Sequence, residues 1–396
     1  MRVCFLTTSY PRRSGDPSGD FVRQLVNALA AEHSAEIVVI APADVNAYHC
    51  EKDKNITTYR CRYFWPYRWQ KLAYGDGIPW NLKHSFIAWL NIPFLLAAIS
   101  FRMMIAARKA DIIHANWGIL GAAAAVLRPF HRRPVVVMIH GTDLSSKNKL
   151  ITSVTRWAIR HANAVITNSP ENYAFVRQLR QDKENCWYIN NGVQYPSDKE
   201  LAELRKKHKK QDDIINIVSA ARFIPERRYD IVLRAFAKVH SQKGNIFLTI
   251  VGDGPDFERL KSLAAELNLS SSIRFTGRVP HSEVFEYMAS ADIYVSATTV
   301  ETHGSSVAEA AAYGLPAVVT RVGFPAELVV DGKTGFVVEP NDESALAEAM
   351  IKLTQDAELR QKAGNDMRRR INELGLSWSA CAEKTMGVYR NCTKMR

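Results

Sequence analysis

Residues 293–320, which read IYVSATTVETHGSSVAEAAAYGLPAVVT, hold the pattern that decides the fold. The β-branched run Ile293–Ser296 predicts a strand, and the Ala-rich stretch in the middle predicts a helix ended by Gly314-Leu-Pro316. A second β-branched run, Ala317–Thr320, predicts the next strand. Because two strands joined through a helix form a βαβ unit, the pattern indicates a parallel sheet.

The same alternation of short apolar runs and longer amphipathic segments extends over the whole chain. Most runs are almost continuously apolar, which is typical of parallel strands covered on both faces. The predicted strands are Val3–Leu6, Ile37–Ala41, Asp111–Ala115, Val135–His140, Ala164–Thr167 and Trp187–Asn190, then Ile214–Ser219, Ile246–Val251, Ile273–Thr276, Ile293–Ser296, Ala317–Thr320 and Phe336–Val338. A polar connector, Tyr195–Asp213, separates the two sets. We therefore predict an α/β protein with two Rossmann-like, doubly wound parallel-sheet domains, at residues 1–195 and 196–375.

The composition is that of an ordinary globular protein, with 396 residues of which 47% are hydrophobic and 23% charged. It excludes disordered, collagen-like and coiled-coil proteins. The six cysteines are scattered without CxxC spacing, which favours a reducing cytoplasm and argues against a zinc site. We expect no signal peptide. The most apolar stretch, Ser85–Met104, is interrupted by Asn91, Pro93 and Arg102, so we expect a core-facing helix over Ser85–Arg108 rather than a membrane span.

The basic excess lies almost entirely in the first half of the chain. Residues 1–195 carry 24 Lys and Arg against 13 Asp and Glu, a net charge of +11, whereas residues 196–396 carry 28 against 27, or +1. A basic half suggests an anionic partner, and a solubilising surface is the alternative. Within this half, Arg60–His84 interleaves basic and aromatic residues, which suits nucleic-acid stacking or a membrane interface. Alternatively, these aromatic side chains only cover the sheet.

The loop between the strand Ile293–Ser296 and its helix holds the strongest candidate site. Its small residues lead into the helix, so backbone N–H groups and the positive end of the helix dipole predict an anion site suited to a diphosphate. Glu301 in the loop and Glu309 in the helix can face one ligand, where carboxylates accept hydrogen bonds from sugar or ribose hydroxyls. An exposed loop with a solvated glutamate is the alternative. The residues of the anion site are Gly304, Ser305, Ser306 and Val307.

Other candidate residues also follow predicted strands, where open α/β sheets bind ligands. Arg222 and Arg227 lie five residues apart on one such loop and can clamp phosphate oxygens. Gly19 precedes the first predicted helix and repeats the logic of an anion site, and His140 ends a strand just before a glycine. A structural role is the alternative for His140. The sequence Gly252-Asp-Gly254 is only part of a dinucleotide-binding motif, so it predicts no dinucleotide site.

Taken in order, these motifs resemble family 4 of the retaining glycosyltransferases, the group 1 glycosyltransferases, which have the GT-B fold. The most specific part is Glu301-x7-Glu309, continued as EAAAYGLPAVV. The resemblance extends nearly end to end, through Ser18-Gly19-Asp20-Phe21-Val22, Asp111–Trp117, His140-Gly141-Thr142-Asp143, Asn191-Gly192-Val193, Arg222 with Arg227, Gly252–Pro255, Gly277-Arg-Val279, Asp331-Gly332, Gly335-Phe336 and Trp378.

The resemblance implies a domain plan of two Rossmann-like domains that face a central cleft. Residues 1–195 bind the acceptor, residues 196–375 bind the nucleotide-sugar, and residues 376–396 form a helix that crosses back to the N-terminal domain. It also implies the predicted catalytic residues, which are His140, Arg222, Arg227 and Glu301.

In the same way, the resemblance implies a role for each matching position. Glu309 accepts hydrogen bonds from ribose hydroxyls, and Val279 lies near the base. Glu301 and His140 contact the donor sugar. The two arginines, together with the N–H groups of residues 304–307, hold the diphosphate, and Gly19 lets its own loop approach it. The chain has no DxD motif, so we expect the arginines to replace a divalent ion, with no metal and no cofactor beside the nucleotide-sugar substrate.

Three positions depart from the pattern of the family. Arg227-Arg228 stands where relatives usually have Lys-Gly, and His303 stands where they usually have an aromatic residue. Phe324 replaces the second residue of a frequent glycine pair near Gly323. These departures leave the identity of the donor sugar open.

We therefore expect a retaining glycosyltransferase that moves a sugar from a nucleoside-diphosphate sugar to a saccharide acceptor. The expected acceptor is lipid-linked and is a precursor of cell-surface polysaccharide, such as lipopolysaccharide or exopolysaccharide. The expected location is cytoplasmic, peripheral on an anionic membrane surface at the inner face of the cell membrane, with no nucleic-acid partner. A GT-B-like sugar-nucleotide epimerase, which needs no acceptor, is one alternative. A nucleic-acid-binding protein is another, but it leaves Glu301-x7-Glu309 unexplained.

Overall fold

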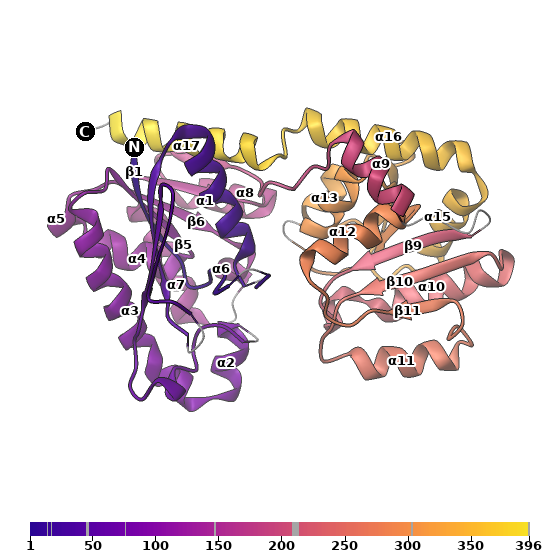
Figure 1. Ribbon diagram of the computed structural model, residues 1–396, viewed down its shortest axis with the longest axis horizontal. Helices are drawn as coiled ribbons and strands as arrows, with labels where there is room; N and C mark the ends of the chain where they lie inside the picture. Colours follow the sequence, from indigo (N-terminus) through magenta and orange to yellow (C-terminus); the bar gives the residue numbers. More distant parts are fainter. Residues whose placement is uncertain are drawn as a thin grey trace. The chain divides into compact units, whose positions relative to one another are not determined.

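A computed structural model describes residues 1–13, 15–16, 18–44, 47–75, 77–145, 148–207, 214–301 and 304–394 of the chain. It divides the chain into two compact units (Figure 1). Unit 1 consists of Met1–Gly192 together with Trp378–Arg396, and unit 2 consists of Val193–Ser377. The division thus falls at Gly192 rather than at residue 195, and the C-terminal segment returns to unit 1 from Trp378 rather than from residue 376.

Unit 1 is built on an eight-stranded sheet with the order β3-β4-β2-β1-β5-β6-β7-β8. Neighbouring strands are parallel except for the edge pair β3 and β4, which is antiparallel. The sequence pattern does not indicate this edge pair, because β3 contains no apolar run and β4 is only half-buried. The strands are β1 (Arg2–Leu6), β2 (Glu36–Pro42), β3 (Cys50–Asp53), β4 (Ile56–Cys61), β5 (Ile112–Asn116), β6 (Val135–Ile139), β7 (Ala164–Thr167) and β8 (Cys186–Tyr188).

Helices cover both faces of this sheet. Val3 and Phe5 of β1 pack in one core with α1 and α17, whereas Cys4 and Leu6 pack in a second core with α3 and α4. Helix α17 runs beside α1, and its Tyr389 hydroxyl lies 2.7 Å from His114 Nδ1 in β5 (Figure 1). The helices are α1 (Asp20–His33), α2 (Ile78–His84), α3 (Phe86–Ala107), α4 (Gly118–Val126), α5 (Arg128–His131), α6 (Gly141–Ser145), α7 (Lys149–His161), α8 (Pro170–Leu179) and α17 (Trp378–Lys394), with a 3₁₀ turn at Tyr67–Trp69.

Unit 2 is built on a six-stranded, fully parallel sheet with the order β11-β10-β9-β12-β13-β14. One core contains residues of α10, α11 and α15, and the other contains residues of α12, α13 and α16. The strands are β9 (Ile215–Ala220), β10 (Ile246–Val251), β11 (Ile273–Phe275), β12 (Ile293–Ser296), β13 (Ala317–Thr320) and β14 (Gly335–Val338). The helices are α9 (Asp198–Lys207), α10 (Tyr229–Gln242), α11 (Phe257–Glu266), α12 (His281–Ser290), α13 (Ser305–Ala312), α14 (Gly323–Leu328), α15 (Glu343–Gln355) and α16 (Ala357–Glu373), with a 3₁₀ turn at Pro225–Arg227.

Each sheet reverses its strand order beside its first strand. In unit 1, β1 lies between β2 and β5, and in unit 2, β9 lies between β10 and β12. Connections that leave such a pair on opposite sides open a crevice at the carboxyl ends of the strands, which is where doubly wound sheets bind ligands. The loops that follow β1 and β5, and those that follow β9 and β12, are therefore the places to look for a site. The predicted α/β architecture of two doubly wound parallel sheets is confirmed.

The structure corrects the expectation for the apolar helix of unit 1. Helix α3 does pack on the core, through Leu95, Ile99 and Met103 among others. Its opposite side, however, is exposed along the whole helix, and within its most apolar window only 28% of the residues are buried. By length and composition alone, α3 is also the one helix among the described residues that is long and apolar enough to cross a membrane. The prediction of a core-facing helix therefore holds for only one side of α3.

A second correction concerns the basic and aromatic segment Arg60–His84. Arg60 is buried, because its guanidinium donates hydrogen bonds to the carbonyl oxygens of Tyr10 and Pro11 and to the Tyr74 hydroxyl. Tyr74 is buried with it. Arg60 therefore fastens β4 to the loop after β1 and presents no charge to a partner, unlike the exposed Arg62 and Arg68.

Candidate active site

Two neighbouring loops of unit 2 are joined at the switch point between β9 and β12. Thr299 N donates a hydrogen bond to the Glu226 carbonyl oxygen at 2.8 Å, and Thr298 Oγ1 donates to the same oxygen at 3.0 Å. Glu226 lies in the loop after β9 and the threonines lie in the loop after β12. The predicted phosphate loop and the predicted glutamate loop, which are more than 70 residues apart in sequence, are thus brought together.

The loop after β12 ends in an open helix N-terminus. Gly304 precedes α13 with φ +63°, and a Cβ at this position would lie 2.2 Å from Pro325 Cγ, so only glycine fits. Its N-cap residue is this glycine, which supplies no side-chain cap. The Val307 N–H donates to the Gly304 carbonyl oxygen at 2.9 Å, which leaves the N–H groups of Ser305 and Ser306 as the donors best placed for an anion.

The hydroxyl of Tyr294 connects this helix N-terminus with β9. It lies 2.8 Å from Ser306 Oγ and 3.2 Å from the Ala220 carbonyl oxygen. Burial raises the pKa of Tyr294 to about 12, so the group stays a neutral hydroxyl at any physiological pH. It therefore holds the start of α13 against the end of β9 without adding negative charge to an anion site.

The two predicted catalytic side chains Arg227 and Glu301 form an ion pair with each other. Both side chains are mostly buried, and Arg227 Nη1 also lies 3.5 Å from Thr298 Oγ1. Arg227 Nε is buried and has no hydrogen-bond partner among the described residues. The sequence indicates a separate ligand for each residue and does not indicate this pair. Arg222, from the same loop as Arg227, has an exposed side chain.

Glu309 lies in the second turn of α13 and pairs with a residue that sequence reasoning missed. His281 Nε2 lies 2.9 Å from Glu309 Oε1, and the Glu309 side chain is mostly buried. His281 begins α12, two residues after Val279, which packs against the core shared with α13. The structure thus brings the two predicted nucleoside residues to adjoining elements. The only signal for His281 was its position just after Val279.

The glycines of the Gly252-Asp-Gly254 sequence support the arginine loop. A Cβ on Gly252 would lie 2.0 Å from the Ala221 carbonyl oxygen, and one on Gly254 would lie 2.3 Å from that of Phe223. Phe223 N also donates to the Asp253 carbonyl oxygen at 2.9 Å. The loop after β10 therefore packs backbone to backbone against the loop that carries Arg222 and Arg227. Its two glycines are needed because any side chain would prevent this close packing.

In unit 1, Gly19 stands where the loop after β1 enters α1. It has φ +70°, and a Cβ there would lie 2.2 Å from the Ser9 carbonyl oxygen. Asp16 fixes the same loop, because it accepts hydrogen bonds from Arg12 N, Arg12 Nε and Ser18 N. Burial alone raises the pKa of Asp16, but these hydrogen bonds outweigh it and hold that pKa well below its usual value. The close approach at Gly19 is therefore built into the loop.

His140 lies at the carboxyl end of β6 and is buried. Its Nε2 is 3.1 Å from Asn116 Oδ1, and its ring contacts the rings of Phe21 and Trp117 at centroid distances of 5.2 and 5.0 Å. Asp143 accepts hydrogen bonds from His140 N and from the backbone N–H that opens α4. Burial raises the pKa of Asp143 to about 6, although these two hydrogen bonds oppose the rise. The ring of His140 is thus held by Asn116 and by aromatic neighbours, and its backbone N–H is held by Asp143.

The departures from the family pattern have separate outcomes. Arg228 has φ +48° and pairs with Asp230 and Asn341, so its guanidinium is turned to a different set of residues from that of Arg227. Phe324 is buried beside α13. His303 lies outside the described residues.

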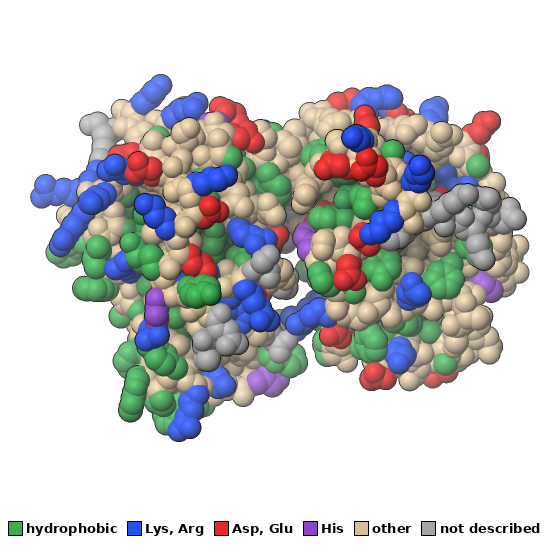
Figure 2. All heavy atoms as spheres, viewed as in Figure 1, with side chains coloured by type: hydrophobic (Ala, Val, Ile, Leu, Met, Phe, Trp, Pro, Cys, Tyr) green, Lys and Arg blue, Asp and Glu red, His purple; other side chains and the backbone are tan. Residues whose placement is uncertain are grey.

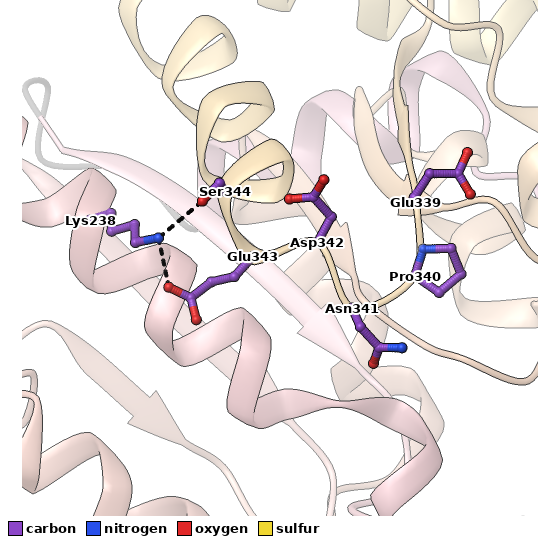
Figure 3. Close-up of a pocket in the computed structure, with 7 residues that line it drawn as sticks. All are labelled: Lys238, Glu339, Pro340, Asn341, Asp342, Glu343 and Ser344. Atoms are coloured by element: carbon purple, nitrogen blue, oxygen red, sulfur yellow. Dashed lines mark hydrogen bonds and ion pairs between the residues drawn. The ribbon is translucent and has the colours of Figure 1, made fainter.

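One surface depression of about 590 Å³ in unit 2 holds none of the predicted site residues (Figure 3). It is lined by Lys238 of α10 and by residues 339–344. Lys238 is paired with Glu343 at 2.8 Å, and Asp342 caps α15 with its side chain. The cation that lines this depression is therefore already neutralised, and the helix N-terminus beside it is already capped. Within the part of the chain that the structure describes, no group of three His, Cys, Asp or Glu side chains could hold a metal ion.

Two doubly wound parallel sheets, with a charged switch-point site in the second, are the architecture of the GT-B fold. Sucrose-phosphate synthase from Thermosynechococcus elongatus superposes with a TM-score of 0.81 at 21% identity, over 100% of both chains. HepE from Anabaena, solved with UDP, superposes with a TM-score of 0.73 at 19% identity, over 99% of this chain and 100% of HepE.

The sequence comparisons give the family. Residues 201–370 match the family described as glycosyl transferases group 1, and residues 18–192 match the glycosyl transferase 4-like domain. N-acetyl-alpha-D-glucosaminyl L-malate synthase from Bacillus anthracis is 27% identical over 71% of this chain and 75% of its own length. GDP-mannose-dependent alpha-(1-6)-phosphatidylinositol monomannoside mannosyltransferase from Mycolicibacterium smegmatis is 31% identical over 60% of this chain and 66% of its own. The chain belongs to the group 1, family 4 glycosyltransferases, and this does not favour the epimerase alternative.

Proposed function

We propose that this glycosyltransferase takes its sugar from a nucleoside-diphosphate sugar held by unit 2. The carrying observation is the convergence, at one switch point, of Arg227, Glu301 and the uncapped N-terminus of α13. A guanidinium and a helix N-terminus bind phosphate oxygens, and a carboxylate binds sugar hydroxyls. These are the groups that a nucleotide-sugar presents.

In the proposed reaction, the bond between the anomeric carbon and the diphosphate breaks, and its electron pair leaves on the diphosphate. The acceptor hydroxyl oxygen bonds to the same carbon and passes its proton to an oxygen of the departing diphosphate, with retention of configuration, as the family resemblance implies. Arg222, Arg227 and the N–H groups of Ser305 and Ser306 stabilise the negative charge that grows on the leaving group. Because these groups are cationic or dipolar, we propose that no divalent metal ion is needed.

The ion pair gives Glu301 a second task in this proposal. Arg227 has five N–H donors, so its contact with Glu301 through Nη1 leaves other donors for phosphate oxygens. The pair then couples the grip on the leaving diphosphate to the position of the carboxylate that contacts the donor sugar. Glu309 takes the ribose hydroxyls, with His281 orienting it, and Val279 lies near the base. For Gly19 and His140 we keep the contacts with the diphosphate and the donor sugar that the resemblance implies.

We further propose that the acceptor is a lipid-linked saccharide, a precursor of cell-surface polysaccharide, and that the protein works at the cytoplasmic face of a membrane. Two observations support this. The basic excess is confined to the first half, with +11 against +1. The mannosyltransferase relative is named for action on phosphatidylinositol monomannoside.

The function is tested by release of nucleoside diphosphate in the presence of defined donors and acceptors. UDP-glucose, UDP-N-acetylglucosamine and GDP-mannose are first ranked by thermal shift, because a ligand of the folded state raises its stability. The best donor is then incubated with a polyprenyl-diphosphate-linked monosaccharide, with the free saccharide, or with no acceptor. Acceptor-dependent release supports the proposal. Isomerisation of the donor without acceptor identifies an epimerase, and silence with every donor contradicts the nucleotide-sugar assignment.

A further inference from the structure

Helix α3 presents an apolar side to solvent from its first turn to its last. Its exposed large side chains follow one another at helical spacings, mainly three, four or seven residues, so they share one side of the helix, while the buried residues share the other. With a rise of about 1.5 Å per residue, this side is roughly 33 Å long. We call it the α3 apolar face, formed by Phe86, Trp89, Leu90, Phe94, Phe101 and Ile105.

No charged side chain interrupts the α3 apolar face. Arg102 is the one charged residue within α3, and its guanidinium lies 3.6 Å from the ring centroid of Tyr59 in β4, so it is turned against the sheet edge. A helix at the surface of a water-soluble domain normally carries polar residues on its outer side, and a continuous apolar patch of this kind marks an interaction site. We therefore expect the outer side of α3 to be an interaction surface.

Aromatic residues from two neighbouring segments extend the α3 apolar face. Phe64 packs edge-on against Phe94 with ring centroids 5.1 Å apart, and Trp89 Nε1 donates to the Leu82 carbonyl oxygen at 2.8 Å. These contacts join the loop around residue 65 and the helix α2 to α3. Both segments expose amphipathic rings, which belong to Trp65, Tyr67, Trp69 and Trp80. Figure 2 shows hydrophobic side chains gathered over the part of unit 1 that contains α2 and α3, with Lys and Arg side chains beside them.

The charges of the chain segment that carries the α3 apolar face are almost all positive. Residues 54–110 contain nine Lys and Arg and a single acidic residue, Asp76. Seven of these bases are exposed, namely Lys54, Arg62, Arg68, Lys71, Lys83, Arg108 and Lys109. A second copy of the chain on this face would set these charges against the same charges, whereas an anionic surface would neutralise them.

We propose that the α3 apolar face lies in the headgroup region of an anionic lipid bilayer, with α3 parallel to the membrane plane. Apolar side chains enter the acyl boundary, tryptophan and tyrosine rings lie at headgroup depth, and the surrounding bases contact anionic lipid. Because the inner side of α3 is packed on the sheet, the helix lies on the membrane and does not cross it. This deepens the membrane-bound acceptor of the proposed function, but its test needs neither donor nor acceptor.

The test is sedimentation of the full-length protein with vesicles of phosphatidylcholine containing phosphatidylglycerol at about one part in four. We expect the parent to bind, and the variant Phe86→Ser/Phe94→Ser/Phe101→Ser to bind at least about tenfold more weakly. The matched control pairs Phe101→Ser with Leu150→Ser, because the two residues are 70% and 71% exposed and Leu150 lies on α7. Leu150→Ser should bind like the parent, whereas Phe101→Ser should bind more weakly. If the triple variant sediments like the parent, the proposal is wrong.

Fluorescence provides a second readout, in which the parent protein itself reports the depth of its tryptophans. The parent should be quenched by vesicles whose acyl chains carry bromine. The variant Trp65→Phe/Trp69→Phe/Trp80→Phe/Trp89→Phe should lose most of that quenching. Quenching that survives unchanged in this variant would overturn the assignment of the surface. If the triple serine variant instead turns a dimer into a monomer in light scattering, a second copy covers the face and the proposal is also wrong. Transferase activity on a soluble acceptor stays as in the parent, so failure here is distinct from failure of the proposed function.

Discussion

The two units share one architecture but differ in the chemistry at their switch points. In unit 2, the loops after β9 and β12 present Arg227, Glu301 and an uncapped helix N-terminus, all of which carry full or partial charge. In unit 1, the corresponding region holds His140 beside Asn116 and the rings of Phe21 and Trp117. A doubly wound sheet therefore decides where a ligand binds, and the loops decide its chemical class.

The surfaces of the two units differ even more than their switch points. Of 17 large hydrophobic side chains that are exposed among the described residues, 16 belong to unit 1 and one, Val300, belongs to unit 2. All eight tryptophans also lie in unit 1. The comparison suggests a division of labour, in which unit 2 handles a soluble anion and unit 1 handles an amphipathic partner. It also gives an experimental advantage, because tryptophan fluorescence reports on unit 1 alone.

The largest expected effect tests the charged switch point of unit 2. Arg227→Ala removes a cation from the leaving diphosphate and leaves Glu301 without its partner. Loss of one such contact costs about 2–4 kcal/mol in the transition state, so we expect kcat to fall by about 30-fold to 1000-fold. Steady-state transfer measures this, with Arg321→Ala as the control, because Arg321 forms an exposed ion pair with Glu339. A fall of less than about fivefold would remove Arg227 from the reaction.

The second prediction separates the two glutamates of the same site. Glu309→Ala should weaken binding of the nucleoside diphosphate by about tenfold, because a ribose hydroxyl loses a charged acceptor. Glu301→Ala should mainly lower kcat, because it loses a sugar contact and also releases Arg227. Calorimetric titration with UDP and GDP, beside kcat and KM for each variant, distinguishes the two roles. Unchanged nucleotide affinity in Glu309→Ala would count against the ribose assignment.

Much of this site follows from sequence because it lies at strand ends. The apolar run Ile293–Ser296 marks β12, and the loop that follows must emerge at the carboxyl edge of the sheet, as must the loop after β9. Small residues before an Ala-rich helix likewise indicate an open helix N-terminus. Local pattern and topology were therefore enough to bring Arg227 and Glu301 to one edge.

The side-chain partners could not be predicted, because they depend on contacts between distant segments. Arg227 and Glu301 are 74 residues apart, and His281 and Glu309 are 28 residues apart. Burial of Arg60 depends on carbonyl groups about 50 residues away. The apolar composition of α3 also hides which side is buried, because a helix that is apolar all round has no hydrophobic periodicity to read.

The third prediction uses the buried histidine His114 of unit 1. Burial, and next the nearby His140, lowers the pKa of His114 to about 3. The unfolded chain binds a proton at this position below pH 6.5, but the folded chain does not, so stability falls as pH falls from 6.5. Between pH 7 and 5 this loss is about 2 kcal/mol at roughly 1.4 kcal/mol per pH unit.

The variant His114→Gln should not show this loss of stability between pH 7 and 5. The stability of the variant at pH 7 also differs from that of the parent, so the pH dependence is the quantity to compare. Urea unfolding followed by tryptophan fluorescence measures it for unit 1 at both pH values. Asp143 has a folded pKa raised to about 6, so its contribution to stability falls as pH rises from 3.8 to 6, which is the opposite sense. Because Asp143 is present in both proteins, the difference between their pH dependences isolates His114. Equal pH dependence in the two proteins would show that this histidine is not held neutral.

The smallest expected effect is that of a chelator. If the guanidinium of Arg227 and the N-terminus of α13 supply the positive charge at the diphosphate, EDTA should leave kcat within about twofold of its untreated value. Glu301 is paired with Arg227, and Glu309 lies 2.9 Å from His281, so each of these carboxylates already has a basic partner. Activity that is lost in EDTA and restored by Mg²⁺ or Mn²⁺ would show that a metal ion shares the diphosphate. The comparison between the units would then need revision, because the charge of the second switch point would come partly from outside the chain.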